Sequence, residues 1–104
     1  MISNNLFSLK GKTALVTGGS TGIGLMATVG LVSAGAKVFI VSRKLENCQN
    51  AAKELNNYGF EGEVIPFRGD LSSEAGVNNI TNEIYSKNSK LHILVNNAGR
   101  TWGS

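Results

Sequence analysis

The chain has 104 residues, of which 41% are hydrophobic, and carries a formal net charge of +3 at pH 7. This length predicts one small domain rather than two. The ten lysines and arginines are scattered along the sequence without interleaved aromatic residues, which argues against a nucleic-acid-binding surface. The single cysteine excludes an intrachain disulfide framework and is typical of a reducing compartment.

No stretch of the sequence predicts a membrane segment or a secretion signal. Residues 13–36 contain no charge, but six glycines and two serines interrupt the apolar run that a spanning helix requires. Residues 1–9 lack both a charge and an apolar core of signal-peptide length. We therefore expect a cytoplasmic protein, with an organellar matrix as the alternative, and no membrane partner.

The chain begins its regular structure with a strand and a helix. Residues 13–16 are an apolar, β-branched run that predicts a short buried strand over residues 12–17, and residues 22–34 predict a helix. This helix is apolar nearly all round, which predicts that it packs on a sheet and is covered by neighbours. Gly35 is expected to end it as a left-handed C-cap. Residues 37–42 are continuous β-forming residues, a pattern typical of a parallel strand buried on both faces.

The second predicted helix covers residues 45–56 and contains the single cysteine. The apolar residues of this helix recur at spacings of three, four and three, so they share one face: Leu45, Cys48, Ala52 and Leu55. Cys48 is therefore predicted to be a small core residue rather than a nucleophile.

The remaining elements are a strand, a helix and a further strand. Residues 63–67 form a strand that Pro66 places at a sheet edge, because proline has no N–H to donate. The next helix is expected to start near Ser72 as N-cap. Its apolar face comprises Val77, Ile80 and Ile84. Residues 91–95 are apolar and predict a strand that is paired on both sides.

Strands and helices that alternate at this spacing indicate right-handed βαβ units. The predicted fold is an α/β, Rossmann-type, doubly wound parallel sheet with strand order 3-2-1-4. In this order the apolar strand 91–95 lies at an edge, where it would favour aggregation. We therefore expect residues 1–104 to be the N-terminal part of a single larger domain, with further strands missing or supplied by another chain. The isolated chain should be poorly soluble or dimerise through this strand.

The glycine-rich segment 17–24 joins the first strand to the first helix. Gly18, Gly22 and Gly24 permit a tight turn and a close approach of backbone N–H groups to a ligand. The N-terminus of the following helix adds unpaired N–H donors and a partial positive charge, which suit a phosphate. This corner predicts a nucleotide site.

Three motifs at the ends of three strands resemble those of the classical short-chain dehydrogenase/reductase family. They are Thr17-Gly18-x-x-x-Gly22-Ile23-Gly24, Asp70-Leu71, and Asn96-Asn97-Ala98-Gly99. The resemblance implies that the first motif lines the cofactor pyrophosphate and the adjacent ribose, through Gly18, Ser20, Thr21, Gly22 and Ile23. It implies that Asp70 and the Leu71 backbone hold the adenine, and that Asn97, Ala98 and Gly99 border the riboses. A helix cap is the structural alternative for Asp70, and Asn96 is expected to tie strand ends together.

The end of the second strand indicates which cofactor the chain binds. An acidic residue there favours NAD, whereas an arginine accommodates the 2′-phosphate of NADP. The sequence has Ser42-Arg43-Lys44, and the first acid is Glu46. We therefore predict NADP(H) rather than NAD(H), with Ser42 and Arg43 at the site. The alternative is that Arg43 is a solvated loop charge.

The catalytic residues that the resemblance implies are not found in these 104 residues. The family uses a Ser and a Tyr followed four residues later by Lys, whereas Tyr58 and Tyr85 are followed at that spacing by Gly62 and Ser89. We expect the NADP(H)-binding part of a reductase that acts on a ketone or alcohol and forms a homo-oligomer. The alternative is a non-catalytic nucleotide-binding or regulatory module. No catalytic residue and no metal ligand are predicted in this chain, His92 included.

One pair of residues points toward a substrate. Trp102-Gly103 is similar to a pair found in members that resemble 3-oxoacyl-carrier-protein reductases, including the rhamnolipid-pathway type. This similarity implies a 3-oxoacyl or related substrate. A hydrophobic plug on the next helix is the alternative.

Overall fold

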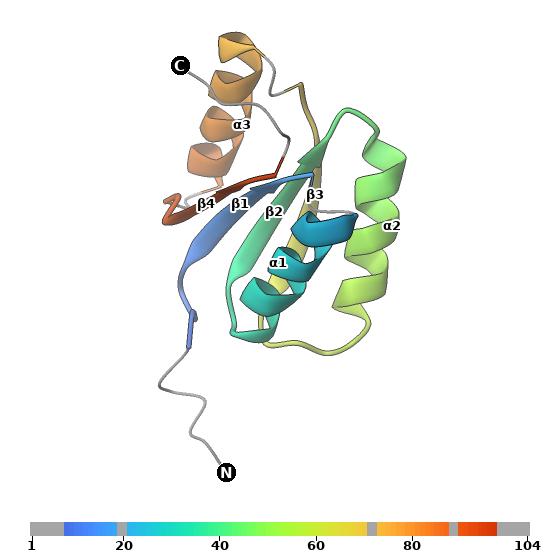
Figure 1. Ribbon diagram of the computed structural model, residues 1–104. Helices are drawn as coiled ribbons and strands as arrows, with labels where there is room; N and C mark the ends of the chain where they lie inside the picture. Colours follow the sequence, from blue (N-terminus) through green and yellow to red (C-terminus); the bar gives the residue numbers. More distant parts are fainter. Residues whose placement is uncertain (1–7, 19–20, 71–72, 88–89, 98–104) are drawn as a thin grey trace.

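The computed structural model describes residues 8–18, 21–70, 73–87 and 90–97. Within these residues, strands and helices alternate along the chain (Figure 1). The elements are β1 (Thr13–Thr17), α1 (Gly22–Ser33), β2 (Lys37–Ser42), α2 (Leu45–Asn56), β3 (Glu63–Arg68), α3 (Glu74–Ser86) and β4 (Ile93–Asn96).

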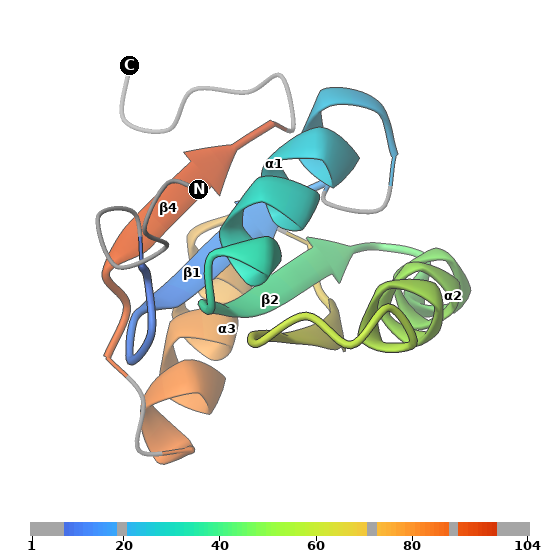
Figure 2. The same ribbon diagram turned by 90° about the horizontal axis from the view of Figure 1, so that it is seen from below.

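The strands form one parallel sheet in the order β3-β2-β1-β4, which confirms the predicted order and fold class. Helices α1 and α2 lie on one face of the sheet, and α3 lies on the other (Figures 1 and 2). The strand order reverses direction between β1 and β4. In sheets of this type, ligands bind outside the carboxyl ends of the strands at such a point.

Strand β2 is buried on both faces, as its uninterrupted apolar sequence predicts. Val38 and Ile40 belong to the core under α1 and α2. Phe39 and Val41 belong to the core under α3, where the Phe39 and Phe67 rings stack with centroids 5.3 Å apart. Alternate residues of one strand therefore hold both helical layers to the sheet.

Capping residues set the end of α1 and the start of α3. Gly35 follows α1 with φ +106°, and its N–H donates to the carbonyl of Val32 while the Ala36 N–H donates to Leu31. This is the predicted left-handed C-cap in its Schellman form. Helix α3 begins after Ser73, whose hydroxyl accepts a hydrogen bond from the Gly76 N–H at 3.1 Å. The expected N-cap at Ser72 was therefore wrong by one residue.

Cys48 is fully buried on the inner face of α2, beside Ala52 and Leu55. Burial raises the pKa of its thiol, and a hydrogen bond with Ser42 opposes this shift only in part. The thiol is therefore held in its protonated form at neutral pH, which agrees with the predicted core role.

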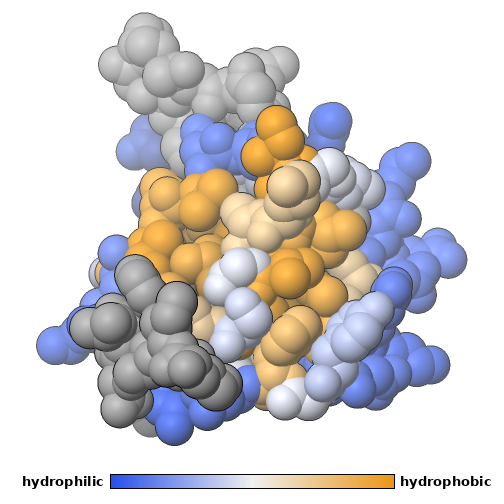
Figure 3. Space-filling model, turned by 60° about the horizontal axis from the view of Figure 1, so that its bottom comes forward, coloured by the Kyte–Doolittle hydropathy of each residue, from blue (hydrophilic) through white to orange (hydrophobic). Residues whose placement is uncertain are grey.

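The sheet edges agree with the predicted strand order, whereas the exposure of α1 does not. Strand β3 with Pro66 lies at one edge, as predicted, and β4 lies at the other. The prediction that α1 is covered by neighbours on all sides was wrong within the described residues. Ile23 and Met26 are each 73% exposed, and Leu94 of β4 is 52% exposed. Figure 3 shows apolar side chains gathered over this face of the molecule.

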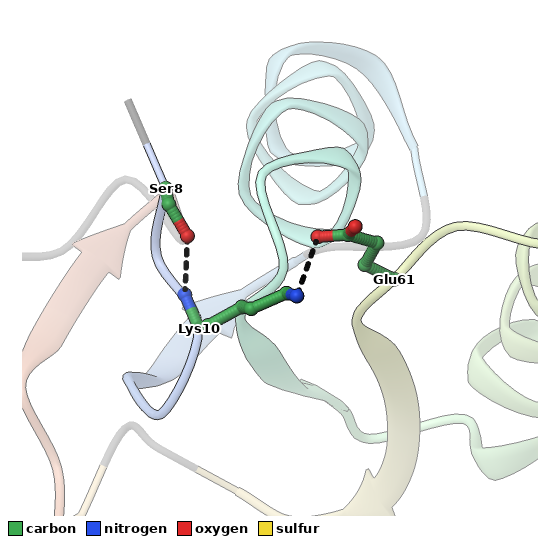
Figure 4. A network of polar contacts seen from close by, with 3 residues as sticks. All are labelled: Ser8, Lys10 and Glu61. Carbon is green, nitrogen blue, oxygen red and sulfur yellow. Dashed lines mark hydrogen bonds and ion pairs between the residues drawn. The ribbon is translucent and has the colours of Figure 1, made fainter. Parts of the chain in front are cut away.

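The segment before β1 is held against the end of α1 and the segment that precedes β3. The Lys10 ammonium lies 3.7 Å from a Glu61 carboxylate oxygen, and the Lys10 N–H donates to the Ser8 hydroxyl at 3.3 Å (Figure 4). The stronger anchor is the bond from the Leu9 N–H to the Ala34 carbonyl at 2.7 Å, because exposed ion pairs contribute little. In the part of the chain that is described, no helix has both the length and the apolarity needed to cross a membrane.

We predict that the 104-residue chain self-associates through the outer edge of β4. This strand pairs only with β1 among the described residues, and it exposes Leu94. Lysine on an edge strand blocks pairing with a second edge. Sedimentation velocity should therefore detect dimers or larger species for the parent chain and a monomer for Leu94→Lys. Tyr85→Lys, an exposed position on α3, serves as the control and should still associate. A parent chain that sediments as a monomer at high concentration would contradict this prediction.

Candidate functional site

Each of the four strands has a predicted site residue at or just after its carboxyl end. Because the strands are parallel, their carboxyl ends lie along one edge of the sheet. The residues brought there are Gly18 after β1, Ser42 and Arg43 at β2, Asp70 after β3, and Asn97 after β4. The parallel topology thus brings the separated sequence motifs to one edge of the sheet.

The glycine corner brings the start of α1 close to the end of β1. Gly18 and Gly22 have φ values of +64° and +55°, which favour glycine. A Cβ atom at Gly24 would overlap the Gly18 carbonyl and lie 2.8 Å from Nδ2 of Asn97. Thr21, the N-cap of α1, makes no side-chain capping bond. The first-turn N–H groups of α1 are therefore not capped by Thr21 and can donate to an anion.

Thr17 joins the ends of β1 and β4. Its buried hydroxyl accepts a hydrogen bond from the Asn97 N–H at 2.7 Å and donates to Oδ1 of Asn96 at 3.1 Å. This confirms that Asn96 ties strand ends together. The same bonds fix Asn97, whose side-chain nitrogen would lie 3.6 Å from a Cβ atom at Gly18. The carboxamide of Asn97 therefore borders the glycine corner.

A hollow of about 350 Å³ lies at the ends of β2 and β3 and is lined by Arg43, Arg68, Gly69 and Asp70. The Gly69 N–H donates to the Ser42 carbonyl at 3.0 Å, which holds the two strand ends together. The N-cap residue of α3 is Ser73, not Asp70. The Ser42 hydroxyl accepts from the Lys44 N–H at 3.1 Å, so this side chain has a structural role in the turn.

Arg68 is the residue that sequence reasoning missed. The strand was predicted to end at Phe67, whereas β3 continues through Arg68, which pairs in register with Ser42. The available signal was a basic residue two positions before Asp70, at the carboxyl end of a strand next to Arg43.

The remaining predicted residues lie at the start of α1, at the opposite end of the sheet or outside the described residues. Ser20, Leu71, Ala98 and Gly99 lie outside the described residues, as do Trp102 and Gly103. Thr21, Gly22 and Ile23 are exposed at the start of α1. The His92 ring accepts the Thr13 N–H through Nδ1 at 3.0 Å, a structural role at the opposite end of the sheet. Within the described residues, no group of three metal-ligating side chains occurs.

A larger hollow, about 580 Å³, lies between α1 and α2. Its lining includes the apolar side chains of Leu25, Val29 and Phe60, and Thr21 is the one predicted site residue there. The carboxyl edge is the better candidate because it combines glycine-lined backbone donors with guanidinium groups.

The close approach of Gly24 to Gly18 predicts contrasting effects at two glycines of α1. Gly24→Ala should lower the free energy of unfolding by about 1–3 kcal/mol, because the added methyl group overlaps a backbone carbonyl. Gly30→Ala is the matched control, since nothing lies within 4 Å of its added methyl group. It should raise stability by about 0.5–1 kcal/mol through helix propensity. Urea denaturation measures both, and equal effects would contradict the packing argument.

The hydroxyl of Thr17 should contribute to stability beyond the packing of its methyl group. Thr17→Val leaves the half-buried Asn97 N–H without its acceptor, which should cost about 0.5–1.5 kcal/mol. Thr81→Val is the control, because the Thr81 hydroxyl donates to the Val77 carbonyl one turn earlier in the same helix. Urea denaturation should show the larger loss for Thr17→Val. A loss no greater than that of the control would show that this hydrogen bond does not hold the strand ends.

Solved structures with this fold include nucleotide complexes. RhlG of Pseudomonas aeruginosa, solved as an active-site complex with NADP, superimposes with a TM-score of 0.80 at 47% identity, over 91% of this chain and 37% of that one. L-sorbose reductase of Gluconobacter frateurii, solved with NADPH and L-sorbose, gives 0.81 at 33% identity, over 90% of this chain and 35% of that one.

Sequence comparison also finds a related reductase. The rhamnolipids biosynthesis 3-oxoacyl-[acyl-carrier-protein] reductase of Pseudomonas aeruginosa is 50% identical over 98 residues, which cover 94% of this chain and 37% of the relative. The chain thus spans about a third of the length of the curated relatives it matches. The model of the short chain dehydrogenase family matches residues 12–104. The chain therefore belongs to the short-chain dehydrogenase family.

Proposed function

We propose that the chain is the NADP(H)-binding part of an oxidoreductase that transfers a hydride between the nicotinamide and a ketone or alcohol. The observation that carries the choice of NADP(H) is Arg43. It follows the carboxyl end of β2 and lines a hollow with a second arginine. A guanidinium binds phosphate oxygens through paired hydrogen bonds, whereas a carboxylate in this place favours the 2′-hydroxyl of NAD.

The described residues fit a dinucleotide along the carboxyl edge. The close contact between Gly24 and Gly18 brings the N-terminus of α1 to the sheet edge, where its N–H groups can bind the pyrophosphate. In this proposal the pyrophosphate lies against Gly18, Thr21, Gly22 and Ile23, together with Ser20. Asp70, with Leu71, binds the adenine, and Asn97, with Ala98 and Gly99, borders the riboses. Arg43 binds the 2′-phosphate, and Ser42 orients the turn that carries Arg43.

The nicotinamide, when bound, supplies or accepts the hydride. This chain's residues bind and orient the dinucleotide, and the proton-transferring residues are proposed to lie outside residues 1–104. No tyrosine of the sequence is followed four residues later by lysine. We accordingly propose that the chain is the N-terminal part of a single dinucleotide-binding domain in a homo-oligomeric protein.

A 3-oxoacyl compound is the substrate class we propose. The support is the relative named a 3-oxoacyl-[acyl-carrier-protein] reductase, which is 50% identical over nearly the whole chain. Oxidation of NADPH by the full-length protein on addition of a 3-oxoacyl thioester tests this assignment. A simple ketose serves as the comparison, because a second relative with this fold was solved with L-sorbose.

Arg43→Asp should lower the preference of the full-length protein for NADPH over NADH. Charge-assisted hydrogen bonds contribute about 1.5–3 kcal/mol, so the ratio of NADPH to NADH affinity should fall about 10- to 100-fold. Isothermal titration calorimetry with each nucleotide measures the ratio. Lys53→Glu changes the charge equally in the last turn of α2 and should leave the ratio unaltered. An unchanged ratio for Arg43→Asp would refute the assignment of NADP(H) to this residue.

A further inference from the structure

The hollow at the ends of β2 and β3 is lined by two arginines that come from different elements. Arg43 follows β2, and Arg68 is the last residue of β3. Arg68 pairs in register with Ser42, the residue directly before Arg43. The parallel pairing of two strands therefore places both guanidinium-bearing residues at one small hollow.

The alternation of side chains along β3 shows how Arg68 enters it. Val64 packs in the core under α1 and α2, whereas Ile65 and Phe67 pack in the core under α3. Arg68 is four residues after Val64, so it lies on the same face of the sheet as α2. Arg43 lies in the turn that leads into α2. Both arginines line this one hollow, Arg68 from the last position of β3 and Arg43 from the turn after β2.

The charges around this hollow favour an anion. Arg43 and Arg68 are both exposed, and neither forms an ion pair with any described residue. Two like charges at one hollow repel each other, and a phosphate dianion between them removes that repulsion while accepting hydrogen bonds from both. Asp70 also lines the hollow, and its carboxylate would repel a phosphate. A phosphate therefore belongs on the arginine side, and a hydrogen-bond donor such as an adenine amino group belongs beside Asp70.

We propose that Arg68 is a second specificity-determining residue, which binds the 2′-phosphate of NADP(H) together with Arg43. This rests on the proposed function, because the phosphate is that of the proposed cofactor. Two guanidinium groups on two strand ends make the site selective for the phosphorylated nucleotide. The parts that both nucleotides share are bound by other residues, the adenine beside Asp70 in the same hollow and the pyrophosphate at the glycine corner.

The test is the affinity of the full-length protein for NADP⁺ and NAD⁺, measured by isothermal titration calorimetry. Arg68→Gln should weaken NADP⁺ binding about tenfold, as expected for the loss of one charge-assisted contact, and leave NAD⁺ binding unchanged. Arg68→Lys keeps the charge but loses the planar fork, so it should retain part of the NADP⁺ affinity. Arg43→Gln should show the same selectivity for NADP⁺, and the double variant should approach the NAD⁺ affinity.

Two controls separate this role from a structural or general electrostatic one. Lys53→Gln removes one positive charge near the far end of α2 and should leave both affinities unchanged. Thermal unfolding of Arg68→Gln without nucleotide should match that of the parent, because Arg68 is exposed at the end of an edge strand.

The outcomes distinguish the two proposals. If Arg43→Gln weakens NADP⁺ selectively and Arg68→Gln has no effect, the role of Arg68 is overturned and the proposed function stands. If Arg68→Gln weakens both nucleotides equally, Arg68 acts on their shared part and its role in specificity is overturned. If the parent protein binds neither nucleotide, the proposed function itself fails.

Discussion

The contact between Gly24 and the carbonyl of Gly18 is the constraint on which the site depends. A side chain at residue 24 would overlap that carbonyl, so only glycine lets α1 start this close to the end of β1. The positive φ values of Gly18 and Gly22 supply the turn between them. A wider corner would leave the helix N-terminus away from the sheet edge. The first-turn N–H groups of α1, which we propose to bind the pyrophosphate, are thus positioned by packing.

The second constraint is the junction of β1 with β4. These strands come from opposite ends of the sequence and are joined at their carboxyl ends by the Thr17 hydroxyl, which bonds to Asn96 and Asn97. The carboxamide of Asn97 is thereby held against the glycine corner. One buried threonine therefore connects a local motif, the glycine turn, to a residue 80 positions away. Polar bonds of this kind fix strand ends where hydrophobic packing alone does not set their position.

The sequence predicted the fold well because its local signals agree. Continuous apolar strands, a proline at residue 66 and alternating helices all indicate one parallel sheet, and Pro66 lies at the edge where it was expected. The errors arose where neighbours decide the outcome. The composition of α1 predicted burial all round, yet Ile23 and Met26 are exposed, because burial depends on what packs outside the helix. Ser72 and Ser73 are equivalent as sequence signals for an N-cap, and only backbone geometry separates them.

The same reasoning explains why Arg43 was found and Arg68 was not. Arg43 follows a strand whose end is fixed by a continuous apolar run, so its place at the edge can be deduced locally. Arg68 was missed because the strand was predicted to end at Phe67, so the register that pairs Arg68 with Ser42 beside Arg43 was not recognised. Between these arginines and Asp70, the hollow offers both signs of charge at neighbouring positions. That polarity suits a ligand with a phosphate at one end and hydrogen-bond donors at the other. A simple anion such as sulfate has no donor to place beside Asp70.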